Sequence, residues 1–390
     1  MSTLTVRAWN VLFGDAILVT VPDRVSGSRC EIRRHILIDV SNVLSGVGGK
    51  DEVFEPVIRD IQRRFCGRLV DLYVMTHEHL DHVQGLLWAA NCGLDLAVDY
   101  AWITASVALG YYARYPEARK RMQMAWRAWL GASRYLAMSF AAATLVMRAL
   151  LNNNNARDTS RCVRYLGKLA RRRTTYLHRE TRLRVGIHHP FVETRFEVLA
   201  PERNTATYYG HMRPLPLATA AGAEDANASE PPGPPADPLA PVGVDPAAFA
   251  RLLATWRGGV AGNLLSIDRA ANNTSIVFVL EWRGWRLLFC GDAEMRSWRM
   301  MQSRLTPVHF LKVGHHGSHN ATPPDAILER VLPASPSDGR RRSALVSTCC
   351  GSYAGVPHAP TLARIARRCG RVVSTADVAP GQSVYQEFRG

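Results

Sequence analysis

Four potential metal ligands, three histidines and one aspartate, fall within one short stretch: His77, His79, Asp81 and His82. Residues 69 to 75 are apolar and β-branched enough for a buried strand, and residues 83 to 88 favour the start of a helix. The first two histidines are two residues apart on an extended segment, so they point to the same side and the other two ligands can face them. Because three imidazoles and a carboxylate suit zinc, the spacing predicts a metal site rather than a His-rich surface turn.

Later stretches place further histidines and aspartates at predicted strand ends. A buried strand that starts at residue 287 ends in Asp292, and another that starts at residue 308 ends in the pair His315 and His316. His358 lies on a loop before a predicted helix. One such group alone would mean little, but together they predict a single cluster with the first motif.

The H-x-H-x-D-H pattern and the order of the later motifs resemble the metallo-β-lactamase superfamily. This resemblance implies an α/β protein, a four-layer αββα metallo-β-lactamase sandwich, with metal-dependent hydrolase activity. It also implies that Asp292 bridges two metal ions. Asp39, at the end of the strand over residues 35 to 39, is implied to support the loop that carries His77 and His79, called the metal loop below; a simple strand-end cap is the alternative for Asp39. The metal ligands implied are His77, His79, Asp81, His82, Asp292, His315 and His316.

Five stretches are similar to the soluble hydrolase domain of ComEC-type competence proteins: residues 14–18, 273–277, 291–294, 315–318 and 357–358. The resemblance covers residues 4 to 100 and 270 to 390. It departs from the superfamily at Asn272 and Asn273, where many members have another metal-binding histidine. We assign these two asparagines to the support of the ligands, and His188 or His189 could replace the missing histidine, although a structural role is the simpler interpretation for both.

The resemblance implies two divalent ions, zinc first and manganese second, about 3.5–4 Å apart and sharing a hydroxide that attacks a phosphoryl group. Because Asn272 and Asn273 stand where many superfamily members have a metal-binding histidine, a single tightly held ion is the alternative. Asp81 and His358 are the candidate catalytic residues. We expect Asp81 to bind one ion and His358 to contact the scissile phosphate or donate a proton to the leaving oxygen. Lys312 and Ser318 are weaker candidates for phosphate contacts.

The charge of the chain favours a polyanionic partner. Lysine and arginine number 48 against 33 acidic residues, which gives a formal net charge of +15, and nucleic acid, DNA before RNA, is the first expectation. An arginine-rich genome is the alternative explanation. The candidate nucleic-acid-binding residues are Arg164, Lys168, Arg171, Arg172 and Arg173, although a solvated helix face would show the same pattern.

The remaining composition is ordinary for a soluble globular protein, with 47% hydrophobic and 21% charged residues. Eight scattered cysteines, no export signal and no stretch long enough for a membrane span predict a cytoplasmic protein with reduced thiols. We expect a single domain over residues 1–390 that carries a helical and basic insertion over 101–190. A stripe of aromatic residues and methionines within residues 103 to 151 predicts core packing or a homodimer interface, and the composition of 213–246 predicts a flexible Pro/Ala-rich loop.

Three functional hypotheses follow. The first is a metal-dependent phosphodiester hydrolase that acts as a nuclease on DNA. The second is a hydrolase of a small phosphodiester, a nucleotide signal or a phosphocholine-type ester, because the same metal core serves those substrates. The third is a binding or scaffold protein that keeps the ligands for stability, which the open ligand set disfavours because structural zinc sites are closed by four protein ligands.

Overall fold

The computed structural model describes residues 2–42, 50–65, 69–123, 156–208, 268–335, 338–349 and 356–390. Within these residues the strands form two sheets, which confirms the predicted mixed α/β architecture. The first sheet has the spatial order β13-β1-β2-β3-β4-β5-β6, and the second has the order β12-β11-β10-β9-β8-β7.

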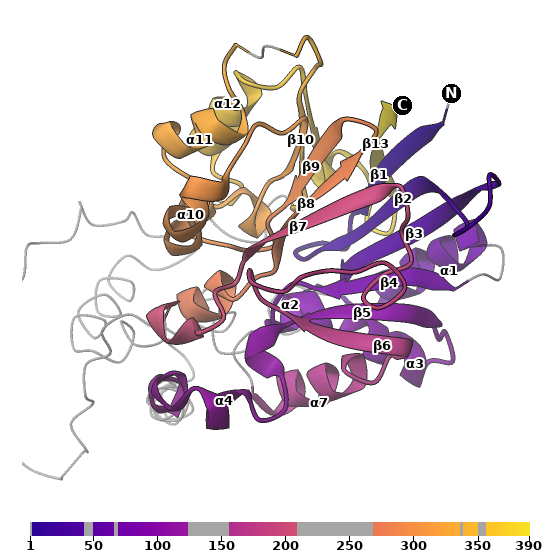
Figure 1. The fold of residues 1–390 in the computed structure, drawn as a ribbon, viewed down its shortest axis with the longest axis vertical. Coiled ribbons are helices and arrows are strands. Elements are labelled where there is room, and N and C mark those ends of the chain that lie inside the picture. Colours follow the sequence, from indigo (N-terminus) through magenta and orange to yellow (C-terminus); the bar gives the residue numbers. More distant parts are fainter. Residues whose placement is uncertain are drawn as a thin grey trace, which may run out of the picture.

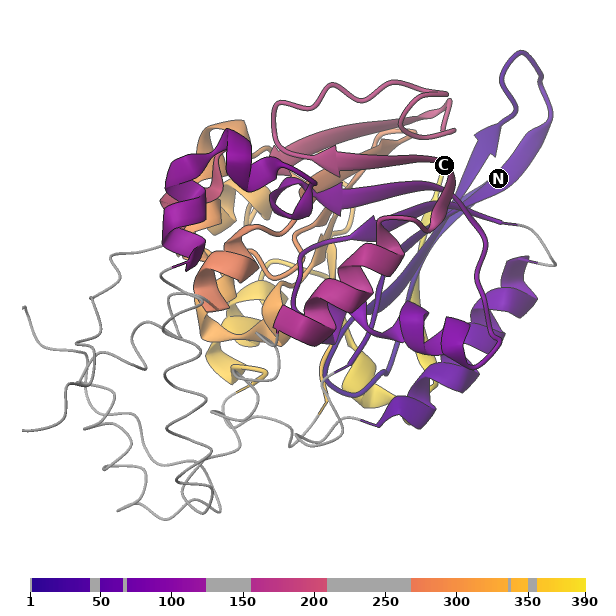
Figure 2. The ribbon, with the colours of Figure 1, turned by 90° about the horizontal axis from the view of Figure 1, so that it is seen from below.

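The first sheet contains β1 (Thr3–Trp9), β2 (Ala16–Arg24), β3 (Glu31–Val40), β4 (Val70–Met75), β5 (Val98–Thr104), β6 (Ala170–Leu177) and β13 (Ser383–Arg389). The second contains β7 (Thr194–Ala200), β8 (Val277–Trp282), β9 (Trp285–Phe289), β10 (Phe310–Lys312), β11 (Ser343–Val346) and β12 (Arg371–Ser374). β13 pairs with β1, so the two ends of the chain lie side by side (Figures 1 and 2). The strands from β3 to β6 are parallel, as are those from β9 to β12.

Helices cover the outer face of each sheet (Figure 1). Those on the first sheet are α1 (Phe54–Phe65), α2 (Leu80–Val83), α3 (Gly85–Asn91) and α7 (Ala156–Leu166). Those on the second are α10 (Met295–Met301), α11 (Asp325–Val331) and α12 (Ala359–Ala366). The other helical segments are α4 (Tyr111–Arg114) and the 3₁₀ turns η2 (Asp51–Val53), η3 (Ala105–Val107), η4 (Thr205–Tyr208), η5 (Gln302–Arg304), η6 (His315–Gly317), η7 (His319–Ala321) and η8 (Thr375–Asp377).

The main core lies between the two sheets. One buried cluster joins side chains of both, including Val74 and Trp102 of the first sheet and Phe278 and Phe289 of the second. Strand β4 is apolar almost throughout because its two faces contact different layers, whereas β13, at the edge, alternates buried and exposed residues. The apolar strands that the sequence predicts before the metal-ligand motifs are therefore central strands of these sheets.

Residues 101–190, the expected helical and basic insertion, are described only in part. The described part contains the end of β5, the helices α4 and α7, and β6, which forms the edge of the first sheet. An edge strand can carry a run of arginines because one of its sides faces solvent. Arg171, Arg172 and Arg173, for which a solvated helix face was the alternative interpretation, therefore lie on a strand. Residues 124–155 lie outside the described residues, and with them most of the predicted dimer surface.

Two further predictions concern the loop over residues 213–246 and the absence of a membrane span. Residues 213–246, predicted as a flexible loop, lie outside the described residues. Among the described helices, none combines the length and apolarity required to cross a membrane.

Candidate metal centre

Asp39 holds the loop that follows β4. It lies near the end of β3, is fully buried, and has a φ of +46°, in the left-handed region. Its Oδ1 accepts a hydrogen bond from the backbone N–H of Thr76 at 2.9 Å, and its Oδ2 accepts one from Thr76 Oγ1 at 2.6 Å. These bonds fix the start of the loop that carries His77 and His79.

His82 joins Asp39 to Asp292. Its Nδ1 lies 2.8 Å from Asp39 Oδ2, and its Nε2 lies 3.2 Å from Asp292 Oδ2. Burial favours the neutral imidazole, but the charges of Asp292 and Asp81 outweigh it and raise the pKa of His82 well above its ordinary value. Burial likewise opposes ionisation of Asp292, yet His82, with His315 and His316, holds the pKa of this carboxyl well below its usual range.

His315 and His316 lie in the turn that follows β10 of the second sheet. Both residues have left-handed backbones, with φ of +46° and +54°, and such conformations cost about 1–3 kcal/mol each in residues other than glycine. His316 Nε2 lies 3.8 Å from both Asp81 Oδ2 and Asp292 Oδ2. His315 donates its backbone N–H to Asp292 Oδ1 at 3.1 Å, and its ring Nε2 lies 4.0 Å from Asp292 Oδ2. The strained turn therefore aims both residues at Asp292.

Neighbouring groups fix the tautomers of two of these histidines. His316 Nδ1 lies 2.9 Å from the carbonyl oxygen of Ser347, which can only accept, so Nδ1 carries the hydrogen and Nε2 presents a lone pair to the cluster. The hydroxyl hydrogen of Thr76 is committed to Asp39, so His77 Nδ1, 3.1 Å away, donates to Thr76 Oγ1. Burial and the nearby His82 lower the pKa of His77 well below its ordinary value, which keeps that ring neutral. Such outer hydrogen bonds are typical of metal-binding histidines.

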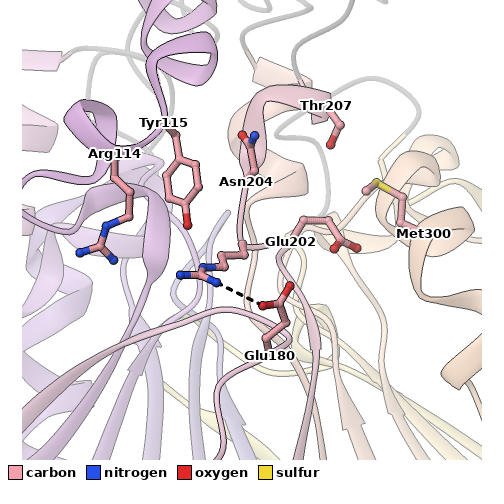
Figure 3. A pocket seen from close by; sticks show the side chains of 8 residues that line it. Arg114, Tyr115, Glu180, Glu202, Asn204, Thr207 and Met300 are labelled. Atoms are coloured by element: carbon pink, nitrogen blue, oxygen red, sulfur yellow. Dashed lines mark ion pairs between the residues drawn. The ribbon is translucent and has the colours of Figure 1, made fainter.

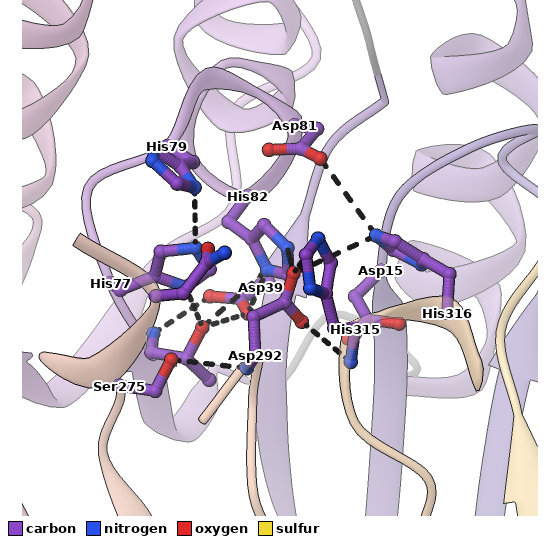
Figure 4. Close-up of polar contacts among 12 residues, drawn as sticks. Asp15, Asp39, His77, His79, Asp81, His82, Ser275, Asp292, His315 and His316 are labelled. Carbon is purple, nitrogen blue, oxygen red and sulfur yellow. Dashed lines mark hydrogen bonds and ion pairs between the residues drawn. The ribbon is translucent and has the colours of Figure 1, made fainter. Parts of the chain in front are cut away.

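The side chains converge into groups that could hold a metal ion (Figure 4). In two of them, His77–His82–Asp292 and Asp81–His82–His316, the potential ligand atoms all lie within 4.8 Å of one another. His79 Nε2, Asp81 Oδ1 and His316 Nε2 are buried and have no hydrogen bond within the described chain. Leaving such an atom unpaired costs about 1–3 kcal/mol, and a divalent cation bound by them would remove that cost. The residues present therefore fit a metal ion.

Asp15 and Lys312 are buried beside this cluster, and the sequence analysis gave Asp15 no role. Lys312 Nζ donates to Asp15 Oδ2 at 3.0 Å, and Asp15 forms a third potential ligand group with Asp39 and His82. Lys312, a weaker candidate for a phosphate contact, is 2% exposed, and its ammonium group contacts Asp15 and the carbonyl of Val313. The sequence feature that could have identified Asp15 is its position between Gly14 and the start of a buried strand.

The two predicted supporting asparagines contact Glu294, a second acidic residue missed at the sequence level. Asn272 Nδ2 donates to Glu294 Oε1 at 2.9 Å, and Asn273 Oδ1 accepts from the backbone N–H of Glu294 at 3.2 Å. Glu294 Oε1 in turn lies 3.6 Å from His315 Nδ1. The asparagines thus act on the cluster through Glu294, which follows Asp292 by two residues.

His358 lies at the edge of the site. Its Nδ1 is 2.9 Å from Thr361 Oγ1, and its backbone N–H donates to the carbonyl of Gly317. Its ring lies 5.1 Å from that of His319, centroid to centroid. Within the described chain no hydrogen bond or ion pair links His358 to the ligands, so its position suits a substrate contact rather than metal binding.

Other predicted residues lie away from the cluster. His189 is buried against Trp102 and Phe196 in the layer between the sheets. Arg173 pairs with Tyr100 at the amino-terminal half of β6, whereas the metal loop begins level with Tyr176, about 10 Å further along the strand. Arg171 and Arg172 lie further still from that end. The predicted basic strip, with Arg164 and Lys168 on the outer helical side, is thus exposed but not brought to the metal centre.

Comparison with known proteins identifies no family: no family model matches the chain, and no curated protein matches it. The interpretation of the site therefore rests on its own residues. What they share is a set of imidazole and carboxylate groups, drawn from both sheets, whose potential ligand atoms lie close together in groups of three.

Proposed function

We propose that this chain is a metal-dependent phosphodiester hydrolase that acts as a nuclease on DNA. The observation that carries the proposal is the convergence of histidines and aspartates from β3, β4, β9 and β10 with buried, unpaired ligand atoms. The cluster offers six potential ligands, His77, His79, Asp81, His82, Asp292 and His316, whereas a closed structural zinc site uses four. The formal charge of +15 supports a polyanionic substrate.

The metal would be held by residues of both sheets. His77, His79 and Asp292 would hold one ion, and Asp81 and His82 would hold a second together with Asp292 and His316. A divalent ion bound there supplies Lewis acidity, which lowers the pKa of a water molecule and polarises a phosphoryl oxygen. Zinc suits the imidazoles, and the carboxylates leave manganese open.

The chain's own residues prepare the site for this chemistry. Asp39 orients His82 and the metal loop, while the carbonyl of Ser347 orients His316. Asp15 and Lys312 neutralise each other behind the cluster, so neither charge competes for substrate. His358, at the rim, is placed to contact a phosphate or protonate a leaving oxygen.

We also propose the fold and relationship suggested by the motifs: a metallo-β-lactamase sandwich related to the hydrolase domain of ComEC-type proteins. The support is the order of the motifs along the chain together with two facing sheets covered by helices on both outer faces. The segment that could close the site against long substrates, within residues 103–151, lies mostly outside the described residues.

The test is cleavage of end-labelled single-stranded DNA, duplex DNA and RNA by the purified chain with zinc or manganese. The double variant Asp81→Ala, His82→Ala is the control, and metal content is measured by mass spectrometry in parallel. Metal-dependent cleavage of DNA that the control lacks would support the proposal. If metal binds but no polymer is cleaved, the nuclease proposal is wrong, and hydrolysis of bis(p-nitrophenyl) phosphate would then favour a small phosphodiester.

A further inference from the structure

A pocket of about 620 Å³ adjoins the metal centre and has no role in the site described so far. Among the described residues, its wall includes three arginines, Arg269, Arg296 and Arg299, and one carboxylate, that of Glu294. Its volume lies within the range of about 300–1,000 Å³ that is typical of small-molecule sites. The pocket therefore has the size and the charge to hold an anionic group.

The arginines of this pocket are available to a ligand. Within the described part of the chain, Arg296 and Arg299 form no ion pair, and Arg269 lies only at 4.0 Å from Glu294. Arginine presents a planar fork of donors that matches phosphate oxygens. Met295, which also lines the pocket and is partly exposed, adds an apolar surface that a base could contact.

A neighbouring pocket of about 460 Å³ is lined by equal numbers of arginines and glutamates (Figure 3). It shares Met300 with the first pocket, but it is lined by two arginines, Arg114 and Arg203, and by two glutamates, Glu180 and Glu202. Arg203 lies 3.7 Å from Glu180. Because its charges cancel, this second pocket offers an anion little, and the contrast selects the pocket beside Glu294.

Two residues connect the arginine pocket to the metal centre. Glu294 lines the pocket and lies 3.6 Å from His315. His319 also lines the pocket, and its ring lies 5.1 Å from that of His358 at the rim of the site. The pocket therefore lies next to residues that contact a candidate ligand and the candidate catalytic residue His358.

We infer that Arg269, Arg296 and Arg299 form a phosphate-binding subsite that holds the backbone phosphates of a nucleic-acid strand next to the scissile one. This inference rests on the proposed function. It assigns the substrate's path to the α10 side of the centre, away from the basic strip on β6, and it makes the arginines positioning residues rather than metal ligands.

The test is binding, which does not depend on cleavage. The full chain is titrated against a fluorescent single strand of about twelve nucleotides, a length within the range of known single-strand sites, and anisotropy is recorded. Phosphorothioate linkages keep the negative charges and resist hydrolysis. The variants are Arg296→Gln, Arg299→Gln together and, as a matched loss of charge on α1, Arg59→Gln, Arg63→Gln together; both of the latter arginines are exposed.

Loss of two charge-assisted contacts should weaken strand binding at least tenfold in the Arg296/Arg299 variant. The slope of log affinity against log salt should also fall by about 1.4, since each single-strand phosphate contact contributes about 0.7. The α1 variant should change neither quantity by as much as half. Equal losses in the two double variants, or pocket-dependent binding of ADP without pocket-dependent binding of the strand, would overturn the subsite. Failure of the proposed hydrolysis would appear separately, as an absence of metal-dependent cleavage.

Discussion

At the scale of single residues, the candidate metal centre depends on side chains that orient the proposed ligands. Asp39 bonds both the backbone of the metal loop and the ring of His82. Ser347 and Thr76 fix which nitrogen of His316 and of His77 faces the cluster. The chemistry of the ligands is thus set one contact further out, where the sequence shows only ordinary polar residues.

Replacing Asp39 should weaken metal binding without removing a ligand. In Asp39→Asn the amide cannot accept from both Thr76 and His82 as a carboxylate does, so zinc affinity should fall about 10- to 100-fold. Competition with a fluorescent chelator measures the affinity. Glu387→Gln, an exposed change of the same kind on β13, should leave it unchanged, and an equal affinity in all three proteins would refute the role of Asp39.

The pair formed by Asp15 and Lys312 should be costly to break and less costly to remove. Both side chains are 2% exposed, and the Lys312→Met variant leaves the Asp15 carboxylate buried without its cation, which should reduce the free energy of unfolding by about 3–5 kcal/mol. The double variant Asp15→Asn, Lys312→Met should recover part of that loss. Urea unfolding of the wild type, the two single variants Asp15→Asn and Lys312→Met, and the double variant gives the coupling energy. Additive effects would contradict the interpretation.

At the scale of elements, the site depends on how closely α3 approaches β3. A Cβ atom at Gly85 would lie 2.3 Å from the carbonyl oxygen of Val40, which is backbone and cannot rotate away. The helix pair α2 and α3 carries Asp81 and His82. Close packing at Gly85 is therefore a condition for bringing these ligands to the cluster.

The Gly85→Ala variant should lose about 3 kcal/mol of stability, at the upper end of the range for overpacking, because the clash is with backbone. Gly93→Ala is the matched control: Gly93 has a φ of +70° but nothing within 4 Å of its Cβ position, so only the left-handed backbone is strained, at about 1–2 kcal/mol. Urea unfolding separates the two, and equal losses would show that α3 can move away from β3 without cost.

Sequence patterns predicted the elements that end in ligands but not the contacts between distant ones. Strands before Asp39, His77, Asp292 and His315 are confirmed because apolar runs report burial on both faces of a central strand. The Asp15–Lys312 pair could not be predicted, since its partners are 297 residues apart and meet only through the topology. Strand β6 was missed because the pairing that makes it a strand comes from β5, not from its own arginines.

At the scale of the whole molecule, the two sheets are joined by a core that also contains a titratable group. His189 is 4% exposed and packs edge-on against Trp102 of β5 and Phe196 of β7. These strands belong to different sheets. Any charge placed on His189 must therefore be accommodated in the layer that holds the sheets together.

Burial, reinforced by the neighbouring His188, lowers the pKa of His189 to about 4, whereas in the unfolded chain it is about 6.5. Between these two pKa values the unfolded chain binds more protons than the folded chain. The contribution of His189 to the free energy of unfolding is therefore constant above about pH 6.5 and falls as the pH is lowered toward 4. At pH 5 this one group should reduce the free energy of unfolding by about 2 kcal/mol relative to pH 7.

The His189→Phe variant keeps an aromatic ring in place but cannot titrate, and its free energy of unfolding should fall by about 2 kcal/mol less than that of the wild type over the same interval. Urea unfolding at both pH values, with a chelator present so that metal release contributes to neither protein, gives the difference directly, because the titration of every other group is common to both. Equal losses would show that His189 is solvated or protonated without penalty in the folded protein.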